Sequence, residues 1–393
     1  MSDQSRLLHR FGRRIRLGMV GGGQDSVIGG THLLAMHADG LCDLVAGTLS
    51  VNPEVAVRSA QDVLIDPARC YADFLEMALK EASREDGIDA VVIATPPHLH
   101  LPLTRAFVDA GIDVICEKPL SRDLEEAKAL RAAVQETGRR FCLTHCYTGY
   151  PMVREARAMI AAGAIGKVRV IEAELSAGDV GVLNEPDDLS KRHWRFRKST
   201  MGPHAILGEV GSHAHNIARF VTGLEVESVS AHMSILAALR EVYDNAYLTV
   251  RWSEGAVGRL WSSYVAAGND QGLWFRIFGE RGSLVWHQED SEFLWHKQAG
   301  EPAVRIAKGY DSLSQDSLRV TRFRPGHPEG YGLAFANLYS EFARELIMSR
   351  LGDAPEHPSL LPNVEDGVRG MALIDAAAKS NDASGAWIPV FSG

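Results

Sequence analysis

The sequence contains no run of 18 consecutive apolar residues, so no segment is long and apolar enough to cross a membrane as a helix. Positive charge is in the minority, because 41 Lys and Arg residues are set against 50 Asp and Glu, which gives a net charge of −9. This balance argues against nucleic acid or an anionic membrane surface as a partner. Internal repeats and low-complexity segments are absent as well. The 393 residues, 46% of them hydrophobic, have the composition of a soluble globular protein and the length of two domains.

Cysteine is scarce, with five residues at positions 42, 70, 116, 142 and 146. An odd and small number in a chain of this length is typical of reduced cytosolic proteins and argues against a disulfide framework. The stretch from Cys142 through His145 to Cys146 contains potential zinc ligands, but Cys142 falls in an apolar run and no second ligand pair occurs elsewhere. We therefore expect no metal centre and a cytoplasmic protein.

Four arginines lie close together near the start of the sequence: Arg10, Arg13, Arg14 and Arg16. A twin-arginine export signal would need an apolar segment and a cleavage site after them. Here the apolar residues that follow are those of an expected first strand. We interpret this stretch as a solvated basic lead-in.

The glycine pattern after that strand departs from the usual dinucleotide-binding spacing. An apolar strand from Ile15 runs into Gly21, Gly22 and Gly23, and a helical pattern begins at Gly29. Strand, glycine turn and helix form the first half of a dinucleotide-binding βαβ unit, with the phosphates at the helix N-terminus. The third glycine of G-x-G-x-x-G is missing, because Ser26 stands there; we interpret Gly29 as its equivalent after a three-residue expansion of the loop. Cofactor contacts are expected from Gly21, Gly23, Gln24, Ser26 and Gly29.

An acidic residue is also missing at the end of the expected second strand, residues 42–49. In NAD-binding folds such an acid holds the ribose 2′-hydroxyl. This chain has Ser50 there, with Arg58 in the next helix, and both residue types are compatible with a 2′-phosphate. The choice between NAD and NADP therefore stays open, and Ser50 is included among the cofactor-binding residues.

Further buried strands are expected at residues 90–94, 112–116 and 141–144, alternating with helices. The fold class is thus α/β, with an N-terminal doubly wound parallel sheet in residues 1–150. Ligands of such sheets bind at the carboxyl ends of the strands. The residues that follow two of these strands are therefore expected to contact the cofactor: Thr95, Pro96, His98, His100, Glu117 and Lys118.

Beyond residue 150 the pattern changes to a run of mostly adjacent strands. Strands are expected at 168–175, 226–234, 246–252, 256–265, 273–279, 283–286 and 292–296. This indicates an α+β domain, residues 151–393, with an open and mostly antiparallel sheet that carries helices on one face. Subunit association is the simplest cover for the other face, so a homodimer or homotetramer is expected. The last helix, from residue 364, and the last strand, near 387–390, are expected to pack near the first domain.

Two separated motifs contain residues suited to acid–base chemistry. Lys118 follows a strand, where its ammonium could polarise a substrate hydroxyl, although such a lysine can equally be a surface charge. Glu209 and His213 are four residues apart and would share a helix face, where a carboxylate fixes the imidazole tautomer of a general base. The alternative is a capped helix with a solvated pair. Gly211 between them is expected to keep that face open near the cofactor.

Nearby histidines raise the question of a metal site; they are His193, His204 and His215. No carboxylate or thiolate pattern accompanies them, and no metal is expected.

Taken in order, these motifs resemble the glucose–fructose oxidoreductase, inositol 2-dehydrogenase and rhizopine-catabolism (Gfo/Idh/MocA) family. The resemblance rests on the glycine loop through His32, the segment from Val92 to His100, the stretch from Cys116 to Leu120, and Gly208 to His213. It extends over nearly the whole chain, including the closing run from Ala376 to Trp387. It implies a Rossmann domain, a C-terminal domain with an open sheet, and NAD(P)-linked oxidation or reduction of sugars, glycosides or cyclitols.

Carried over by motif, Lys118 would hydrogen-bond the reacting hydroxyl and His213 would be the acid or base. Glu209 takes the position of the family's usual aspartate, so its role shifts toward orienting His213. Side chains that could line a polar substrate pocket, or equally be packing and surface residues, are Tyr147, Tyr150, Trp194, Arg195, Arg197 and His327.

Two other functions remain open. Some relatives of this family are glycosidases that use a tightly held NAD for internal oxidation and re-reduction. A non-catalytic dinucleotide-binding protein is the other, and the presence of both Lys118 and His213 argues against it.

Overall fold

The computed structural model describes residues 3–178, 194–202 and 204–391. The chain forms two compact units. The first unit contains Met1–Ser121, Glu125–Cys146 and Tyr331–Gly367, and the second contains Arg122–Leu124, Tyr147–Gly330 and Val368–Gly393. This division differs from a single boundary at residue 150, because a later segment of the chain returns to the first unit.

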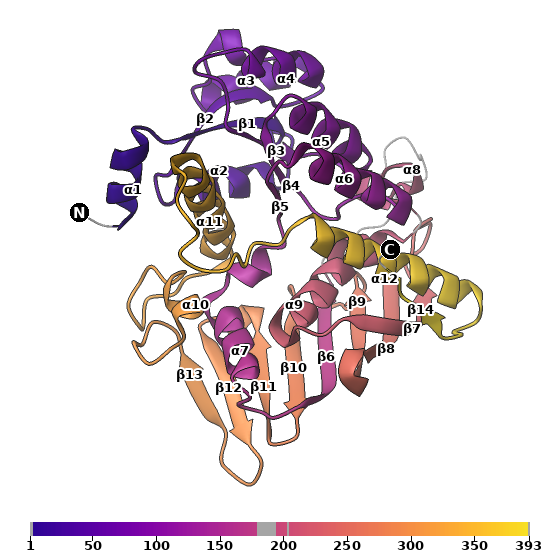
Figure 1. Ribbon diagram of the computed structural model, residues 1–393. Coiled ribbons are helices and arrows are strands. Elements are labelled where there is room, and N and C mark those ends of the chain that lie inside the picture. The colour runs from indigo at the N-terminus through magenta and orange to yellow at the C-terminus, as the bar shows by residue number, and fades with distance from the viewer. Residues whose placement is uncertain (1–2, 179–193, 203, 392–393) are drawn as a thin grey trace. The chain divides into compact units, whose positions relative to one another are not determined.

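The first unit is built on a five-stranded parallel sheet (Figure 1). The order β2-β1-β3-β4-β5 is formed by β2 (Cys42–Thr48), β1 (Ile15–Gly21), β3 (Ala90–Ala94), β4 (Asp113–Cys116) and β5 (Phe141–Leu143). An isolated parallel bridge from Gly47 to Cys70 adds one more chain segment beside β2. Since β1 leads to β2 on one side and has β3 on the other, the strand order reverses at β1, where doubly wound folds bind their ligands. The predicted α/β fold is confirmed.

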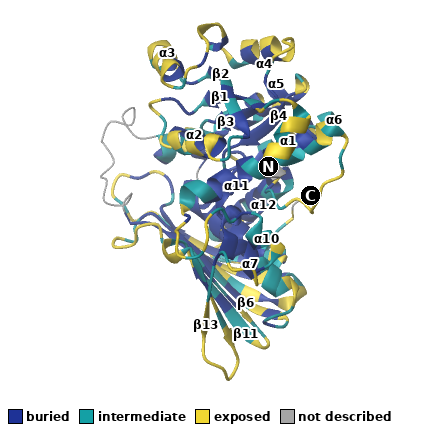
Figure 2. Ribbon diagram, turned by 90° about the vertical axis from the view of Figure 1, so that its left-hand side faces the viewer, coloured by how far each residue is buried: buried dark blue, intermediate teal, exposed yellow. Residues whose placement is uncertain are grey.

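Seven α-helices of the described residues belong to the first unit, and those from α2 to α6 in the chain connect the strands of its sheet. The seven are α1 (Asp3–Phe11), α2 (Gly29–His37), α3 (Pro53–Asp62), α4 (Phe74–Ala82), α5 (His100–Asp109), α6 (Leu124–Thr137) and α11 (Tyr331–Leu351). Every residue of β3 and β4 is buried, as Figure 2 shows in dark blue for the centre of this sheet. Continuous apolar burial of this kind is expected of parallel strands covered on both faces.

The arginine-rich start of the chain differs from the solvated lead-in that the sequence suggested. Residues 3–11 form helix α1, which packs on α11. Arg13 then makes a two-pronged ion pair with the buried carboxylate of Asp89, at 2.6 and 2.9 Å. Arg350 from the end of α11 bonds the same carboxylate. The local sequence could not show this, because the acidic partner lies 76 residues away.

The second unit is built on a nine-stranded sheet of order β13-β12-β11-β10-β6-β9-β8-β7-β14. Its strands are β6 (Val168–Ser176), β7 (Val226–Ser234), β8 (Asn245–Trp252), β9 (Val257–Ser263), β10 (Trp274–Gly279), β11 (Gly282–His287), β12 (Phe293–Gln298), β13 (Val304–Ala307) and β14 (Ile388–Pro389). All neighbours are antiparallel except β6 and β9, which are parallel. The mostly antiparallel sheet is confirmed, whereas the short edge strand β13 was missed. The closing strand β14, expected beside the first domain, pairs with β7 of this sheet.

Helices cover one face of this sheet. They are α7 (Pro151–Ala161), α9 (Ser212–Thr222) and α12 (Val364–Asp382), with the short helices α8 (Lys198–Met201) and α10 (Gln315–Leu318) beside them. Helices α7 and α9 contact strands β6 and β9 to β12. On the other face large side chains stay exposed, including Tyr247, Phe278 and Trp295. None of the helices within the described residues is long and apolar enough to span a membrane.

Candidate active site

The glycine loop between β1 and α2 has a backbone that only glycine fits well. Gly21 and Gly22 adopt φ angles of 76° and 74°, in the left-handed region. A Cβ atom on Gly29 would lie 1.9 Å from the carbonyl oxygen of Gly22. Gly29 therefore performs the close-packing function of the missing third glycine, as the sequence interpretation required.

The expanded part of the loop is held in place by hydrogen bonds. The Gly23 N–H donates to the Leu49 carbonyl at 3.0 Å, and the Gln24 N–H donates to the Ser59 hydroxyl at 3.0 Å. Ser26 accepts from the N–H of Gly29 at 3.2 Å. The residue that precedes α2 is Ile28, which offers no side-chain cap. Ser26 engages only the first N–H of α2, and a helix N-terminus behind a glycine turn suits the anionic pyrophosphate of a dinucleotide.

The end of β2 carries an acid that the sequence analysis missed. The Ser50 hydroxyl donates to a carboxylate oxygen of Asp25 at 3.0 Å. Asp25 belongs to the expanded glycine loop and is exposed. Arg58, which was considered for a 2′-phosphate, lies 3.8 Å from the Glu54 carboxylate in α3. The three extra residues of the glycine loop, which include Asp25, were visible in the sequence. Only the fold shows that the Asp25 carboxylate lies beside Ser50.

In the loop after β3, the Thr95 hydroxyl is suited to bind a cofactor, whereas the side chain of His100 is engaged within the protein. Thr95, Pro96 and His98 are partly exposed, and the buried Thr95 hydroxyl oxygen has no hydrogen-bond partner among the described residues. His100 is completely buried, with Nε2 2.9 Å from the Thr95 carbonyl oxygen and Nδ1 2.9 Å from that of Pro119. Burial lowers the pKa of His100. His100 therefore ties two loops together, and any part it has in cofactor binding acts through them.

Glu117 and Lys118 follow β4, and the two side chains have different surroundings. The Glu117 carboxylate is buried and accepts from the Thr144 hydroxyl at 2.5 Å, while His32 Nε2 lies 3.2 Å away. It also accepts the Lys118 N–H at 3.1 Å. Burial raises the pKa of Glu117, but the hydrogen bond and charge of His32 and the nearby Lys118 outweigh it and bring the pKa to about 2. Lys118 itself is half-buried, and its peptide bond to Pro119 is cis.

These features of the first unit fit a dinucleotide cofactor. The glycine loop leaves no room for Cβ atoms at Gly21, Gly23 and Gly29, the residue before α2 offers no side-chain cap, and a buried hydroxyl at the end of β3 has no partner among the described residues. Each is located at the carboxyl edge of the parallel sheet, where such ligands bind.

In the second unit, His213 lies in the first turn of α9. The preceding residues Leu207–Gly211 form a π-helical turn, where an ordinary helix was expected. A Cβ atom on Gly211 would lie 2.9 Å from the Ser262 hydroxyl. The glycine thus allows a close approach of β9, and this corrects the expectation that it keeps a face open.

The ring of Tyr147 packs against His213. Its imidazole meets the ring of Tyr147 edge-on, with centroids 4.7 Å apart, and Tyr147 stacks in parallel with Tyr150 at 6.2 Å. His213 is 8% exposed and Tyr150 only 2%. Tyr150 packs against Trp286 in the core, so its ring contributes to the scaffold behind His213.

Glu209 has a partner that the spacing did not suggest. It accepts from Arg195 Nε at 2.9 Å, and the Arg195 guanidinium lies over the Trp194 ring at 4.9 Å. Burial and the charge of Glu209 raise the pKa of the neighbouring Tyr264. Two of the expected substrate-lining residues, Trp194 and Arg195, are thereby connected to the motif of His213.

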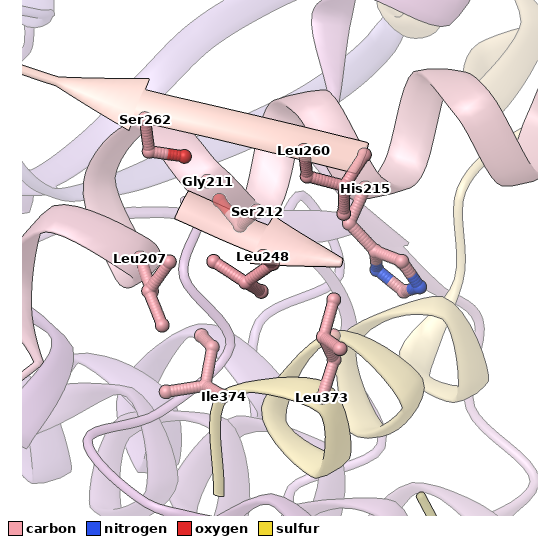
Figure 3. Close-up of a pocket in the computed structure, with 10 residues that line it drawn as sticks. Leu207, Gly211, Ser212, His215, Leu248, Leu260, Ser262, Leu373 and Ile374 are labelled. Carbon is pink, nitrogen blue, oxygen red and sulfur yellow. The ribbon is translucent and has the colours of Figure 1, made fainter. Parts of the chain in front are cut away.

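The other histidines have separate surroundings. His215 stacks on Trp252 at 6.3 Å, beside a small cavity of about 10 Å³ between α9, α12 and the sheet (Figure 3). A space of this size holds about one water molecule. His204 stacks on Tyr243 at 5.8 Å, and His327 is exposed near the Pro325 carbonyl. His193 lies outside the described residues. Within the described part of the chain, His, Cys, Asp and Glu form no group of three suited to a metal ion.

The fold and the glycine loop define a dinucleotide-binding oxidoreductase with a second domain. Residues 15–145 match the model of the GFO_IDH_MocA oxidoreductase family with its NAD-binding Rossmann fold, and residues 153–285 match the GFO/IDH/MocA C-terminal domain. The chain belongs to the Gfo/Idh/MocA family of NAD-binding oxidoreductases.

Individual relatives match over almost their full length. An oxidoreductase structure from Sinorhizobium meliloti is 41% identical, with 96% of this chain and 99% of that chain covered and a TM-score of 0.86. An inositol dehydrogenase homologue from Azotobacter vinelandii, in complex with NADH and myo-inositol, is 34% identical, with 96% and 97% covered and a TM-score of 0.87. Levoglucosan dehydrogenase of Pseudarthrobacter phenanthrenivorans is 28% identical over 96% of this chain and 98% of its own.

Proposed function

We propose that this protein is an NAD(P)-dependent dehydrogenase that acts on a secondary alcohol of a cyclitol, sugar or glycoside. The observation that carries the proposal is that each unit contains one of the two motifs: Lys118 follows the buried Glu117 of the Rossmann sheet, and His213 contacts the ring of Tyr147 in the second unit. The A. vinelandii homologue, whose structure contains NADH and myo-inositol, supports this substrate class.

We assign the proton chemistry to these two side chains. Lys118 donates a hydrogen bond to the reacting hydroxyl, which favours the developing negative charge on its oxygen. His213 accepts the hydroxyl proton in oxidation and returns it in reduction. The nicotinamide, when bound, takes or gives the hydride. The Tyr147 ring restricts the rotation of the imidazole, and the Glu209–Arg195 pair positions the turn that precedes it.

We place the remaining candidates by their surroundings. The glycine loop, Thr95 and Pro96 are proposed to hold the cofactor, whereas His100 positions their loops. Trp194, Arg195 and Tyr147 are proposed to border the substrate. His327 is exposed in the loop before α11 and stays a weaker candidate.

The test is an absorbance assay at the reduced-nicotinamide band with free sugars, glycosides, an anhydrosugar and inositols, each with NAD and with NADP. We expect net formation of reduced cofactor with one of these substrate classes. Cleavage of a glycoside without net reduced cofactor would instead establish the internal-redox glycosidase. Cofactor binding with no turnover on any compound would establish a non-catalytic dinucleotide-binding protein.

We also propose that the protein is a cytoplasmic homo-oligomer. All five cysteines are free thiols, four of them buried, which supports a reducing compartment. The uncovered face of the nine-stranded sheet carries exposed aromatic side chains, which supports an interface between copies.

A further inference from the structure

The structure places an acid at the carboxyl end of β2, where the strand's own sequence has none. In dinucleotide-binding folds, a carboxylate at the end of the second strand receives a hydrogen bond from the adenosine ribose 2′-hydroxyl. Here β2 ends at Thr48, and the residue at the expected position of the acid is Ser50. The Ser50 hydroxyl donates to Asp25 Oδ2 at 3.0 Å. A carboxylate therefore lies at this strand end, although it comes from a different part of the chain.

Asp25 is presented by a loop that is fixed on both sides. Before it, the Gln24 N–H bonds Ser59 of α3 at 3.0 Å and the Gln24 amide bonds Asp62 at 2.5 Å. After it, the Ser26 N–H bonds the Gly23 carbonyl at 2.9 Å. The position of the carboxylate beside Ser50 is thus set by the fold of the expanded loop.

The Asp25 carboxylate can accept a further hydrogen bond from a ligand. Asp25 is exposed, and Ser50 is its single hydrogen-bond donor among the described residues. An ionised carboxylate has about four lone-pair sites, so one bond from Ser50 leaves room for a ribose hydroxyl. The same charge repels the phosphate of NADP, which brings about −1.5 to −2 charges.

In helix α3, which follows Ser50, the one cation is paired with an acid of the same helix. Arg58 is the basic residue of α3, and its guanidinium faces Glu54 one turn earlier. Ser50, which the sequence offered as a phosphate donor, is engaged with Asp25 instead.

We propose that Asp25 is the ribose-binding acid of this enzyme and makes it selective for NAD over NADP. The three-residue expansion of the glycine loop supplies the carboxylate that is missing after the end of β2, and Ser50 orients it. This inference rests on the proposed function, because it concerns the cofactor that the dehydrogenase uses.

The experiment is a fluorescence titration of the full-length protein with NADH and, separately, with NADPH. We expect the wild type to bind NADH about tenfold or more tightly than NADPH, since a charged hydrogen bond and a like-charge repulsion both favour NADH. In Asp25→Asn the charge is removed at nearly constant shape. We expect the NADH preference to fall by about tenfold, through weaker NADH binding and stronger NADPH binding.

Asp43→Asn is the matched control, because it removes one negative charge from the opposite end of β2, where Asp43 pairs with Arg14. Its NADH preference should equal that of the wild type. A wild type that prefers NADPH, or an Asp25→Asn variant with unchanged preference, would overturn the assignment of Asp25 and leave the dehydrogenase intact. A wild type that binds neither nucleotide would overturn both.

Discussion

Lys118 and His213 are held by different kinds of neighbours. The backbone of Lys118 is bonded to the buried Glu117 carboxylate, so its position depends on a polar network. His213 is held by an aromatic edge contact with Tyr147 and by the helix α9 on which it lies. The hydrogen bond to Glu117 fixes the direction of the Lys118 backbone. The Tyr147 ring excludes water from one side of the His213 imidazole and restricts its rotation. The two residues therefore differ in the kind of contact that holds them in position.

Replacing either proposed catalytic residue should abolish chemistry and spare the cofactor. We expect Lys118→Ala and His213→Ala each to lower kcat by about 10²- to 10⁴-fold, the usual contribution of a positioned acid or base. NADH affinity, measured by fluorescence titration, should stay close to that of the wild type. Lys128→Ala and His37→Ala, at exposed positions, serve as controls with unchanged kcat. Near-normal turnover in either catalytic variant would refute the assignment.

At the scale of elements, Glu117 joins four parts of the first unit. It follows β4, accepts from Thr144 after β5, and lies beside His32 of α2. His32 in turn lies 2.7 Å from the Tyr339 hydroxyl of α11. All of these groups are buried, so the network is shielded from water, and a charge left without its partners would be costly there. The returning helix α11 is thereby connected to the strand end that carries Lys118.

This network predicts a specific acid sensitivity. The pKa of Glu117 is about 2 in the folded protein and 4.5 ordinarily, so its stabilisation is complete above pH 4.5 and is lost as the pH falls from 4.5 toward 2. Glu117→Gln has no such charge, and its unfolding free energy should fall less than that of the wild type between pH 6 and pH 3, by on the order of 2 kcal/mol. Urea unfolding at pH values from 6 to 3, followed by circular dichroism, measures the difference.

The control for this comparison is Glu54→Gln, at a position where the carboxylate side chain is 85% exposed. Its stability should follow the wild-type pH profile. A Glu117→Gln profile parallel to the wild type would mean that the carboxylate is not preferentially stabilised in the fold.

At the scale of the molecule, the nine-stranded sheet has one face covered by helices and one that no helix of the described residues covers. The uncovered face alternates aromatic side chains with paired charges. Tyr247 stacks on Trp261 at 5.6 Å, and Glu172 lies between Arg259 and Arg276. Strand alternation places these residues on one side by its period of two. Exposed aromatics rimmed by charges are typical of a surface that binds another protein.

We expect a second copy of the chain to cover this face. The wild type should sediment as a dimer or tetramer in analytical ultracentrifugation, and Phe278→Asp combined with Trp295→Asp should shift it toward the monomer. Leu79→Asp is the control, because this leucine of α4 is 68% exposed on the first unit. An unchanged mass in the double variant would mean that the interface lies elsewhere. A monomeric wild type would mean that there is no such interface.

Local patterns were sufficient for most elements and for the motifs. Buried parallel strands produce apolar runs, and antiparallel strands with one exposed face produce alternation, so both sheets were predictable. The local features that escaped include helix α1, the edge strand β13 and the π-helical turn before α9, as well as the short helices α8 and α10. A short edge strand carries few apolar residues, and a π-helical turn differs from an α-helix in hydrogen bonding and not in composition.

The sequence by itself determined the two domain types, the glycine loop, and the positions of Lys118 and His213 along the chain, because each depends on neighbouring residues. Only the tertiary structure decided which distant groups meet. Asp25 reaches Ser50 across 25 residues, and His32 reaches Tyr339 across 307. Contacts of this kind depend on how helices pack on the strands, and a linear pattern contains no record of that packing. For this reason the sequence shows only that an acid is missing at position 50, whereas the structure places the Asp25 carboxylate beside Ser50.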